Sequence, residues 1–177
     1  MRVFVAVEVP EEIKQQVYDL QRTINSKEAK VRWVSKKNLH LTLAFLGELS
    51  EKKVEEVKEI LKNIKHKPFK ISATEIGFFP DKHKPRVVWI GLEPEKEILD
   101  LQGKVDGELL NYSMDKDQKF KAHVTIGRIN EVNDKTKFFE KMNVKIKGEF
   151  IVEEFILFSS TLTKDGPKYR IIERYLL

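Results

Sequence analysis

The sequence contains no cysteine and only four histidines among its 177 residues. The absence of cysteine excludes disulfide bonds, thiolate nucleophiles and zinc ribbons, and four scattered histidines are too few for an obvious metal cluster. Any catalysis must therefore use imidazole, carboxylate, hydroxyl or cationic groups. We expect neither a metal ion nor a cofactor.

Long apolar runs are also missing. No stretch approaches the roughly 20 consecutive apolar residues that cross a bilayer, and the N-terminal MRVFVAVEVPEE meets acidic residues too early for a secretory signal. No linker separates the two halves of the chain, and 41% of the residues are hydrophobic, which suits one globular domain over residues 1–177. We expect a cytoplasmic monomer without membrane contact.

The charge balance is moderately basic. The 33 Lys and Arg residues outnumber the 28 Asp and Glu residues, which gives a formal net charge of +5. This excess favours an anionic partner, although it is far below the charge density of an arm that coats nucleic acid.

Apolar periodicity predicts alternating strands and helices. Helices are expected after Pro10, from Ser50, from Pro94 and over residues 134–142. Such a mixture without a strict βαβ rhythm predicts an α+β fold with two largely antiparallel sheets flanked by helices. Strands are expected within residues 2–9, 30–35, 39–47, 69–80, 86–93, 120–129, 148–163 and 168–177.

Two segments repeat the pattern His, apolar residue, Thr, apolar residue. They are HLTL at residues 40–43 and HVTI at residues 123–126, and their histidines lie 83 residues apart, close to half the chain. This spacing predicts an internal duplication into two lobes. Because side chains alternate along a strand, each His shares a face with its Thr. Burial of that face would leave polar groups without partners, so we expect both pairs to line one cleft between the lobes.

The residue types in the motif suit phosphate chemistry. Imidazole titrates near neutral pH, so of His40 and His123 one can act as a general acid while the other acts as a general base. The hydroxyls of Thr42 and Thr125 can donate hydrogen bonds to the non-bridging oxygens of a phosphate. One such motif is weak support for a site, but two matched copies favour a joint one.

The two remaining histidines, His66 and His83, lie among lysines and prolines and have no matching partner pattern. We expect both to be solvated loop residues.

The sequence resembles the 2H phosphoesterase superfamily and, within it, the RNA 2′,3′-cyclic phosphodiesterases, also called 2′-5′ RNA ligases. The motif segments HLTLAFLGE and HVTIGR carry the resemblance, which extends over MRVFVAVEVPEEI, GFFPDKHKPRVVWIGLEP and SSTLTKDGPKYRIIERYLL. It implies a bilobal fold, metal-independent opening of a terminal 2′,3′-cyclic phosphate to a 2′-phosphate, and reversible 2′-5′ ligation of RNA ends. It also implies that His40 is the acid and His123 the base, although the pseudo-symmetry of the motifs does not separate these roles.

Two arginines are further candidates for binding RNA phosphate. Arg128 follows His123 by five residues and would face away from it on an ideal strand, but it reaches the rim of the cleft if the strand ends or bulges at Gly127. Arg86 lies next to a turn. A solvated position is the alternative for each, and Tyr169 is a possible ligand contact.

Several aromatic residues are ambiguous between stacking on a nucleobase and packing. Phe78, Phe79 and Trp33 could do either, whereas Phe45, on the opposite parity from His40, is expected in the core.

Two other functions remain open. An RNA-binding module for tRNA maturation would use the basic cleft without turnover and would not need matched histidines. A phosphodiesterase for a small cyclic nucleotide or a 2′-5′ oligoadenylate would keep the same site and differ only in its pocket.

Overall fold

The computed structural model describes residues 1–114, 119–164 and 166–177. These residues form nine strands, four α-helices and a 3₁₀ helix, η1. Along the chain they are β1 (Arg2–Glu8), α1 (Glu11–Thr23), β2 (Ala29–Trp33), η1 (Lys36–Asn38), β3 (His40–Glu48), α2 (Glu51–Leu61), β4 (Phe69–Phe79), β5 (Val87–Glu93), α3 (Glu95–Glu108), β6 (His123–Val132), α4 (Lys135–Met142), β7 (Glu149–Val152), β8 (Glu154–Thr163) and β9 (Gly166–Leu176).

Local sequence accounts for where these elements form. The five central residues of β1 are all buried, which explains its continuous run of apolar side chains. Helices α2 and α4 begin at side-chain caps, because Ser50 accepts a hydrogen bond from the Lys53 N–H and Asp134 accepts one from the Lys137 N–H. The strand expected within residues 148–163 is two strands, β7 and β8, which pair with β4 and β1 in opposite halves of the sheet.

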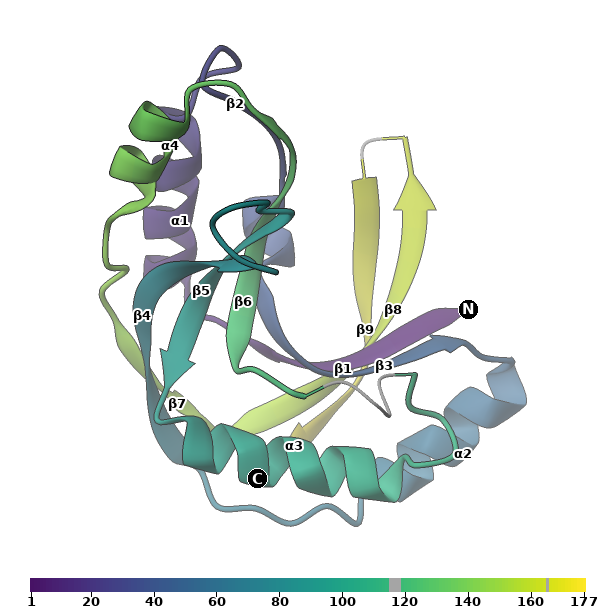
Figure 1. The fold of residues 1–177 in the computed structure, drawn as a ribbon. Coiled ribbons are helices and arrows are strands. Elements are labelled where there is room, and N and C mark those ends of the chain that lie inside the picture. Colours follow the sequence, from purple (N-terminus) through teal and green to yellow (C-terminus); the bar gives the residue numbers. More distant parts are fainter. Residues whose placement is uncertain (115–118, 165) are drawn as a thin grey trace.

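The strands form one curled antiparallel sheet in the order β7-β4-β5-β6-β3-β1-β8-β9, with β2 paired to β6. Its two halves join where Leu41 of β3 pairs with Val124 of β6. Figure 1 shows the hairpin of β8 and β9 rising opposite β2 and β6. The predicted α+β, largely antiparallel architecture is confirmed.

The order of elements repeats along the chain. With β2, η1, β7 and β9 left aside, the series β1-α1-β3-α2-β4 is followed by β5-α3-β6-α4-β8. The last strand of each series lies beside the first strand of the other, since β4 pairs with β5 and β8 pairs with β1. Each half of the sheet therefore contains strands from both series.

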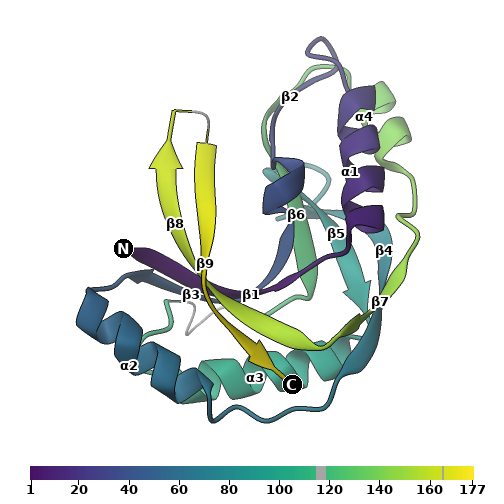
Figure 2. The same cartoon turned by 180° about the vertical axis from the view of Figure 1, so that it is seen from behind.

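The helices cover the side of the sheet that faces away from the His-Thr motifs. Helices α1 and α4 lie together against one half, and α2 and α3 run along the base of the molecule (Figures 1 and 2). The main apolar core lies between these helices and the sheet, where Leu41 and Val124 are almost completely buried. A smaller apolar cluster of Phe4, Ala6, Ile156 and Phe158 lies apart from this core. Among the described helices, none has both the length and the apolar character needed to span a membrane.

A glycine near the middle of β6 permits close contact with β2. A Cβ atom at Gly127 would lie 2.7 Å from side-chain atoms of both Trp33 and Val31. We therefore expect Gly127→Ala to lower the free energy of unfolding by about 1–3 kcal/mol, because an added methyl group in a well-packed site displaces its neighbours. Denaturant-induced unfolding measures the change.

Gly103→Ala is the matched control. Gly103 lies within α3 with open space around its Cβ position, so this change should raise the free energy of unfolding by about 0.5–1 kcal/mol through helix propensity. Changes of the same sign in both variants would contradict the close contact at Gly127.

Candidate active site

The two motifs meet where the halves of the sheet join. Leu41 and Val124 pair there and point into the core, so alternation directs the neighbouring His and Thr residues to the opposite face. Extending this antiparallel register sets His40 across from Thr125 and Thr42 across from His123. The four polar side chains thus form a two-by-two set on one face, and each of them is half-buried.

Each imidazole is oriented by a hydrogen bond to the backbone carbonyl two residues before it. The Nδ1 atom of His40 lies 2.6 Å from the carbonyl oxygen of Asn38, and that of His123 lies 2.6 Å from the carbonyl oxygen of Lys121. Because a carbonyl oxygen only accepts, each Nδ1 must donate and therefore carries a proton. This tautomer leaves both Nε2 atoms available for proton transfer.

Burial favours the neutral form of both rings. It lowers the pKa of His40 to about 4, and the positive charges of Lys14 and His123 act in the same direction. Burial likewise lowers the pKa of His123, where the charge of Lys121 adds to the effect. In the free protein at pH 7 both histidines are neutral, and a bound anion would raise the pKa of both.

Aromatic rings flank each imidazole. The ring centroid of His40 lies 5.0 Å from that of Phe4 and 5.3 Å from that of Tyr169. His123 lies 5.0 Å from Phe79 and 6.1 Å from Trp89. These rings keep water from the sides of the imidazoles, which accounts for the low pKa of both.

Matching bulges lie at the last residue of each motif. In β3, Thr42 and Ala44 pair with consecutive residues of β1, which leaves Leu43 as an extra residue. In β6, Thr125 and Gly127 pair with consecutive residues of β5, which leaves Ile126 as the extra residue. Leu43 and Ile126 are equivalent positions of the motif, so the same irregularity occurs twice.

The bulges change which face the next residues occupy. Phe45 is brought to the face of the motif, where it is 47% exposed and its ring lies 6.2 Å from that of Phe4. The prediction that Phe45 is a core residue is therefore wrong, because it assumed an unbroken alternation from His40. Arg128, at the equivalent place in β6, is brought to the same face.

The structure separates the two candidate arginines. Burial raises the pKa of Tyr169, and the positive charge of Arg128 offsets part of this rise. Arg86 is exposed, and its carbonyl oxygen accepts a hydrogen bond from the Ile129 N–H. This hydrogen bond sets Arg86 opposite Ile129, which is a core residue. Strand alternation therefore directs Arg86 away from the motif face.

The structure also places Phe78 and Trp33, two of the aromatic residues that could stack on a base or pack. Phe78 is buried against Phe138 and Phe139 and serves packing. Trp33 is half-buried over Gly127.

The expectation of a solvated position is wrong for His66. Its side chain is 9% exposed, and its Nε2 atom lies 3.0 Å from a carboxylate oxygen of Asp100. His83, by contrast, is exposed as expected.

Sequence reasoning missed Arg32, Phe4 and Phe158. Arg32 on β2 lies directly opposite Arg128 on β6. The segment around Arg32 was recognisable as a strand, but nothing in the sequence indicated that it pairs with β6. Phe4 and Phe158 stack with centroids 5.2 Å apart in the small apolar cluster beside His40.

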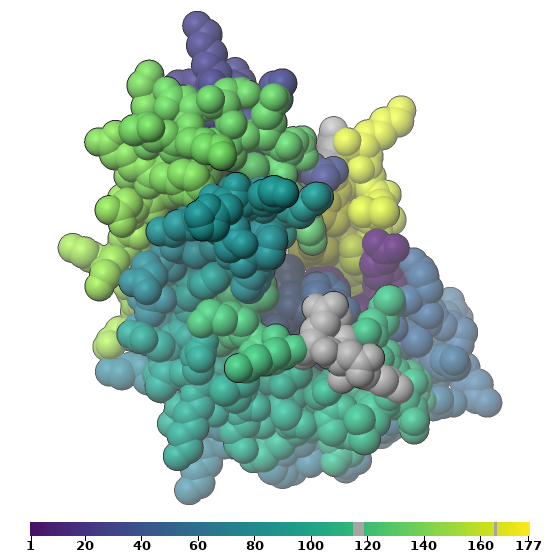
Figure 3. All heavy atoms as spheres, viewed as in Figure 1, coloured from purple at the N-terminus to yellow at the C-terminus, as the bar shows by residue number. Residues whose placement is uncertain are grey.

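Two hollows adjoin the motif face. One of about 350 Å³ lies beside His40 and is lined in part by Asn38, Phe158 and Tyr169. In Figure 3 the surface is hollowed between the teal and green half of the molecule and the yellow hairpin.

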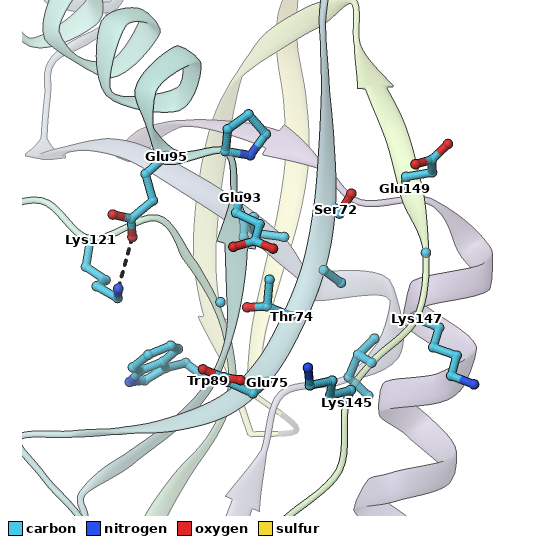
Figure 4. A pocket seen from close by; sticks show the side chains of 16 residues that line it. Ser72, Thr74, Glu75, Trp89, Glu93, Glu95, Lys121, Lys145, Lys147 and Glu149 are labelled. Atoms are coloured by element: carbon cyan, nitrogen blue, oxygen red, sulfur yellow. Dashed lines mark hydrogen bonds and ion pairs between the residues drawn. The ribbon is translucent and has the colours of Figure 1, made fainter.

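The larger hollow, about 960 Å³, lies beyond Trp89 and contains none of the four motif residues (Figure 4). Its lining mixes lysines with glutamates, and Lys121 and Glu95 form an ion pair within it. This mixed charge does not select an anion. Elsewhere in the described parts of the chain, no group of three or more His, Asp or Glu side chains is arranged to hold a metal ion.

Comparison with curated proteins gives relatives along nearly the whole chain. An RNA 2′,3′-cyclic phosphodiesterase of Archaeoglobus fulgidus is 38% identical over 171 residues, covering 96% of this chain and 97% of the relative. A Thermotoga maritima protein of the same name is 36% identical over 177 residues, covering 97% and 93%.

Solved structures share the fold. A Thermus thermophilus protein superposes with a TM-score of 0.85 at 27% identity, covering 100% of this chain and 98% of its own. Escherichia coli LigT in complex with 3′-AMP superposes with a TM-score of 0.80 at 25% identity, covering 99% and 97%.

A family model described as LigT like Phosphoesterase matches residues 7–89 and again residues 90–169, so that each match contains one His-Thr motif. These matches, together with the two-by-two arrangement of the motifs, show that the chain belongs to the LigT-like phosphoesterase family.

Proposed function

We propose that the chain is an RNA 2′,3′-cyclic phosphodiesterase that opens a terminal cyclic phosphate to a 2′-phosphate and that, when an RNA 5′ hydroxyl attacks in place of water, reversibly joins RNA ends by a 2′-5′ bond. Its curated relatives carry the name of this activity. The structural observation that supports the proposal is the two-by-two set of His and Thr with both Nε2 atoms available. We also propose that residues 1–177 are one domain of two duplicated lobes, which the double family match and the matching bulges support.

The two histidines divide the proton transfers of hydrolysis. The Nε2 atom of one takes a proton from the attacking water as the new P–O bond forms, and that of the other donates a proton to the 3′ oxygen as the P–O3′ bond breaks. The product is a 2′-phosphate with a free 3′ hydroxyl. In keeping with the family resemblance, we assign His40 as the acid and His123 as the base.

The threonines have a separate role. Thr42 lies across from His123 and Thr125 lies across from His40, so their hydroxyls approach a bound phosphate from two sides. A threonine hydroxyl does not exchange protons usefully near neutral pH, but it donates hydrogen bonds to oxygens that gain charge in the transition state. Arg128, on the same face, adds positive charge for an anionic substrate. None of these steps requires a metal ion.

Replacement of either histidine should abolish most turnover. We expect His40→Ala and His123→Ala each to lower kcat on RNA with a 2′,3′-cyclic end by about 10²-fold or more, the order lost with a general acid or base. Excess EDTA should leave the wild-type rate unchanged, and His83→Ala, at an exposed loop position, is the control for loss of an imidazole.

The same assays address the other two functions. Tight RNA binding without turnover by the wild type would instead favour the binding module. Turnover of small cyclic nucleotides or 2′-5′ oligoadenylates, but not of cyclic-ended RNA, would favour the small-substrate enzyme.

Replacement of the threonines separates hydrogen bonding from proton transfer. Thr→Val keeps the β-branched shape and removes only the hydroxyl, so Thr42→Val and Thr125→Val should each lower kcat by about 10²-fold while leaving the shape of the pH profile intact. Thr161→Val, at an exposed position of β8, is the control. Full activity in both motif variants would reduce the site to its two histidines.

The pH dependence follows from the lowered pKa of both histidines. Turnover needs one ring protonated and one neutral, a state that is most populated between the two pKa values of the coupled pair. Because burial lowers both values, kcat/KM should peak below the ordinary imidazole pKa of about 6.5 and fall as pH rises.

The profile of kcat should lie at higher pH than that of kcat/KM. The bound phosphate is negatively charged and raises both pKa values in the complex. A profile of kcat/KM that is flat from pH 4 to pH 8 would contradict this use of the histidines.

A further inference from the structure

The residue that anchors each imidazole differs between the two motifs. Asn38 holds His40 and Lys121 holds His123, each through its backbone carbonyl. The side chain of Asn38 is neutral, and its amide donates a 2.7 Å hydrogen bond to the carbonyl oxygen of Pro167. The side chain of Lys121 carries a positive charge. The similarity of the two motifs therefore ends at the residue two places before each histidine.

Two contacts hold the ammonium group of Lys121 near His123. Its Nζ atom lies 2.9 Å from a carboxylate oxygen of Glu95, the first residue of α3. The same atom lies 5.7 Å from the ring centroid of Trp89, which is in turn 6.1 Å from the ring centroid of His123. The lysine is thus held between a helix and an aromatic ring that flanks the imidazole.

Charged and titratable groups approach His123 from several elements. Lys121 lies just before β6, Glu95 begins α3, and Glu93 ends β5 in the wall of the same hollow. His40 on β3 lies diagonally across the two-by-two set, and β4 contributes the uncharged ring of Phe79. Within the described residues, the carboxylate that forms an ion pair with Lys121 is that of Glu95.

The fixed charges around the two histidines are balanced differently. Burial is the largest cause of the lowered pKa at both rings. At His40 the charges of Lys14 and Glu8 act in opposite directions, whereas at His123 the positive charge of Lys121 adds to the effect of burial. A bound phosphate raises the pKa of both rings, and the charge of Lys121 opposes this rise at His123. The charge therefore favours His123 as the ring that stays neutral.

We propose that Lys121 is a positioning residue that keeps His123 neutral in the substrate complex, so that this ring acts as the general base, and that Glu95 holds Lys121 in place and limits its effect. The inference rests on the proposed function, in which the family resemblance assigned the base. A general base must be unprotonated when it takes the proton of the nucleophile, but an anionic substrate promotes protonation of both rings. The charge of Lys121 offsets this effect at the base.

The direct test is the titration of the histidine side chains, followed by NMR. The chain has four histidines, so each Cε1–H signal is assigned from the variant that lacks that ring. Lys121→Met removes the charge and should raise the titration midpoint of His123 by about 0.5 pH unit, the order for one nearby charge in a medium of intermediate dielectric constant. Glu95→Gln leaves the charge unneutralised and should lower the midpoint by a similar amount. Midpoints that move in the same direction in both variants, or do not move, would overturn the proposal.

Two comparisons show whether the charge itself is the cause. Lys121→Arg keeps the charge and should leave the midpoint of His123 close to that of the wild type, whereas a shift as large as that of Lys121→Met would overturn the role of the charge. Both shifts should shrink in about 1 M KCl, because the side chains of Lys121 and Glu95 are 48% and 44% exposed and salt screens such charges.

Lys145→Met and Glu149→Gln are the matched controls. Both residues line the larger hollow, on its opposite side from Lys121 and Glu95 (Figure 4). Each change removes one charge from the hollow and should leave the midpoint of His123 unchanged. Equal shifts in the controls would overturn a specific role for the ion pair.

Turnover then separates the two possible roles of His123. The rate kcat is measured at saturating cyclic-ended RNA, so that attraction between the hollow and the substrate does not enter. If His123 is the base, its easier protonation in Lys121→Met should lower kcat about three-fold at pH 5 and leave it unchanged at pH 9, where the rate follows the proton affinity of the acid. A gain at pH 9 without a loss at pH 5 is the behaviour of the acid and would overturn the assignment.

Failure of the proposed function gives a different result. In that case the wild type does not turn over the cyclic-ended RNA, but the titrations still test the action of Lys121 and Glu95 on His123, because they need no substrate. Opposite shifts in an inactive wild type would support the effect of the ion pair on the ring and refute the reaction alone.

Discussion

The pair between Leu41 and Val124 is the constraint on which the site depends. Within the described residues, β3 and β6 pair at this point alone, and both side chains are at most 1% exposed. Since side chains alternate along a strand, burial of these two residues fixes the neighbouring imidazoles and hydroxyls on the outer face. A slip of one residue would turn the polar groups into the core, so the energy of core packing also holds the two motifs in register.

The surroundings of the histidines complete this arrangement. Each imidazole is held by a backbone carbonyl two residues before it, and among the described residues no carboxylate is hydrogen-bonded to either ring. This anchor fixes the tautomer but carries no negative charge that would stabilise an imidazolium. Together with the aromatic neighbours it favours the neutral form of both rings, and a bound anion would favour proton uptake.

Much of the fold and of the central site could be predicted from the sequence because the signals are local. Period-two alternation marked β1, β3 and β6, and the repeated motif identified His40 and His123 with their threonines. The bulge after the first motif has no such local signal, so strict parity placed Phe45 in the core. The position of Arg32 depends on the pairing of β2 with β6, a contact between segments almost a hundred residues apart that no local pattern encodes.

The paired bulges at Leu43 and Ile126 also bear on how such a molecule can diversify. Each bulge brings a single downstream side chain out of the core without a change in the His and Thr residues of the motif. Substitution of the exposed downstream residues, Phe45 and Arg128, can therefore change the cleft without a change in the core. A cleft with perfect two-fold symmetry presents the same chemistry at both ends, whereas this cleft has phenylalanine at one end and arginine at the other, so that a ligand meets different chemistry in each of its two orientations.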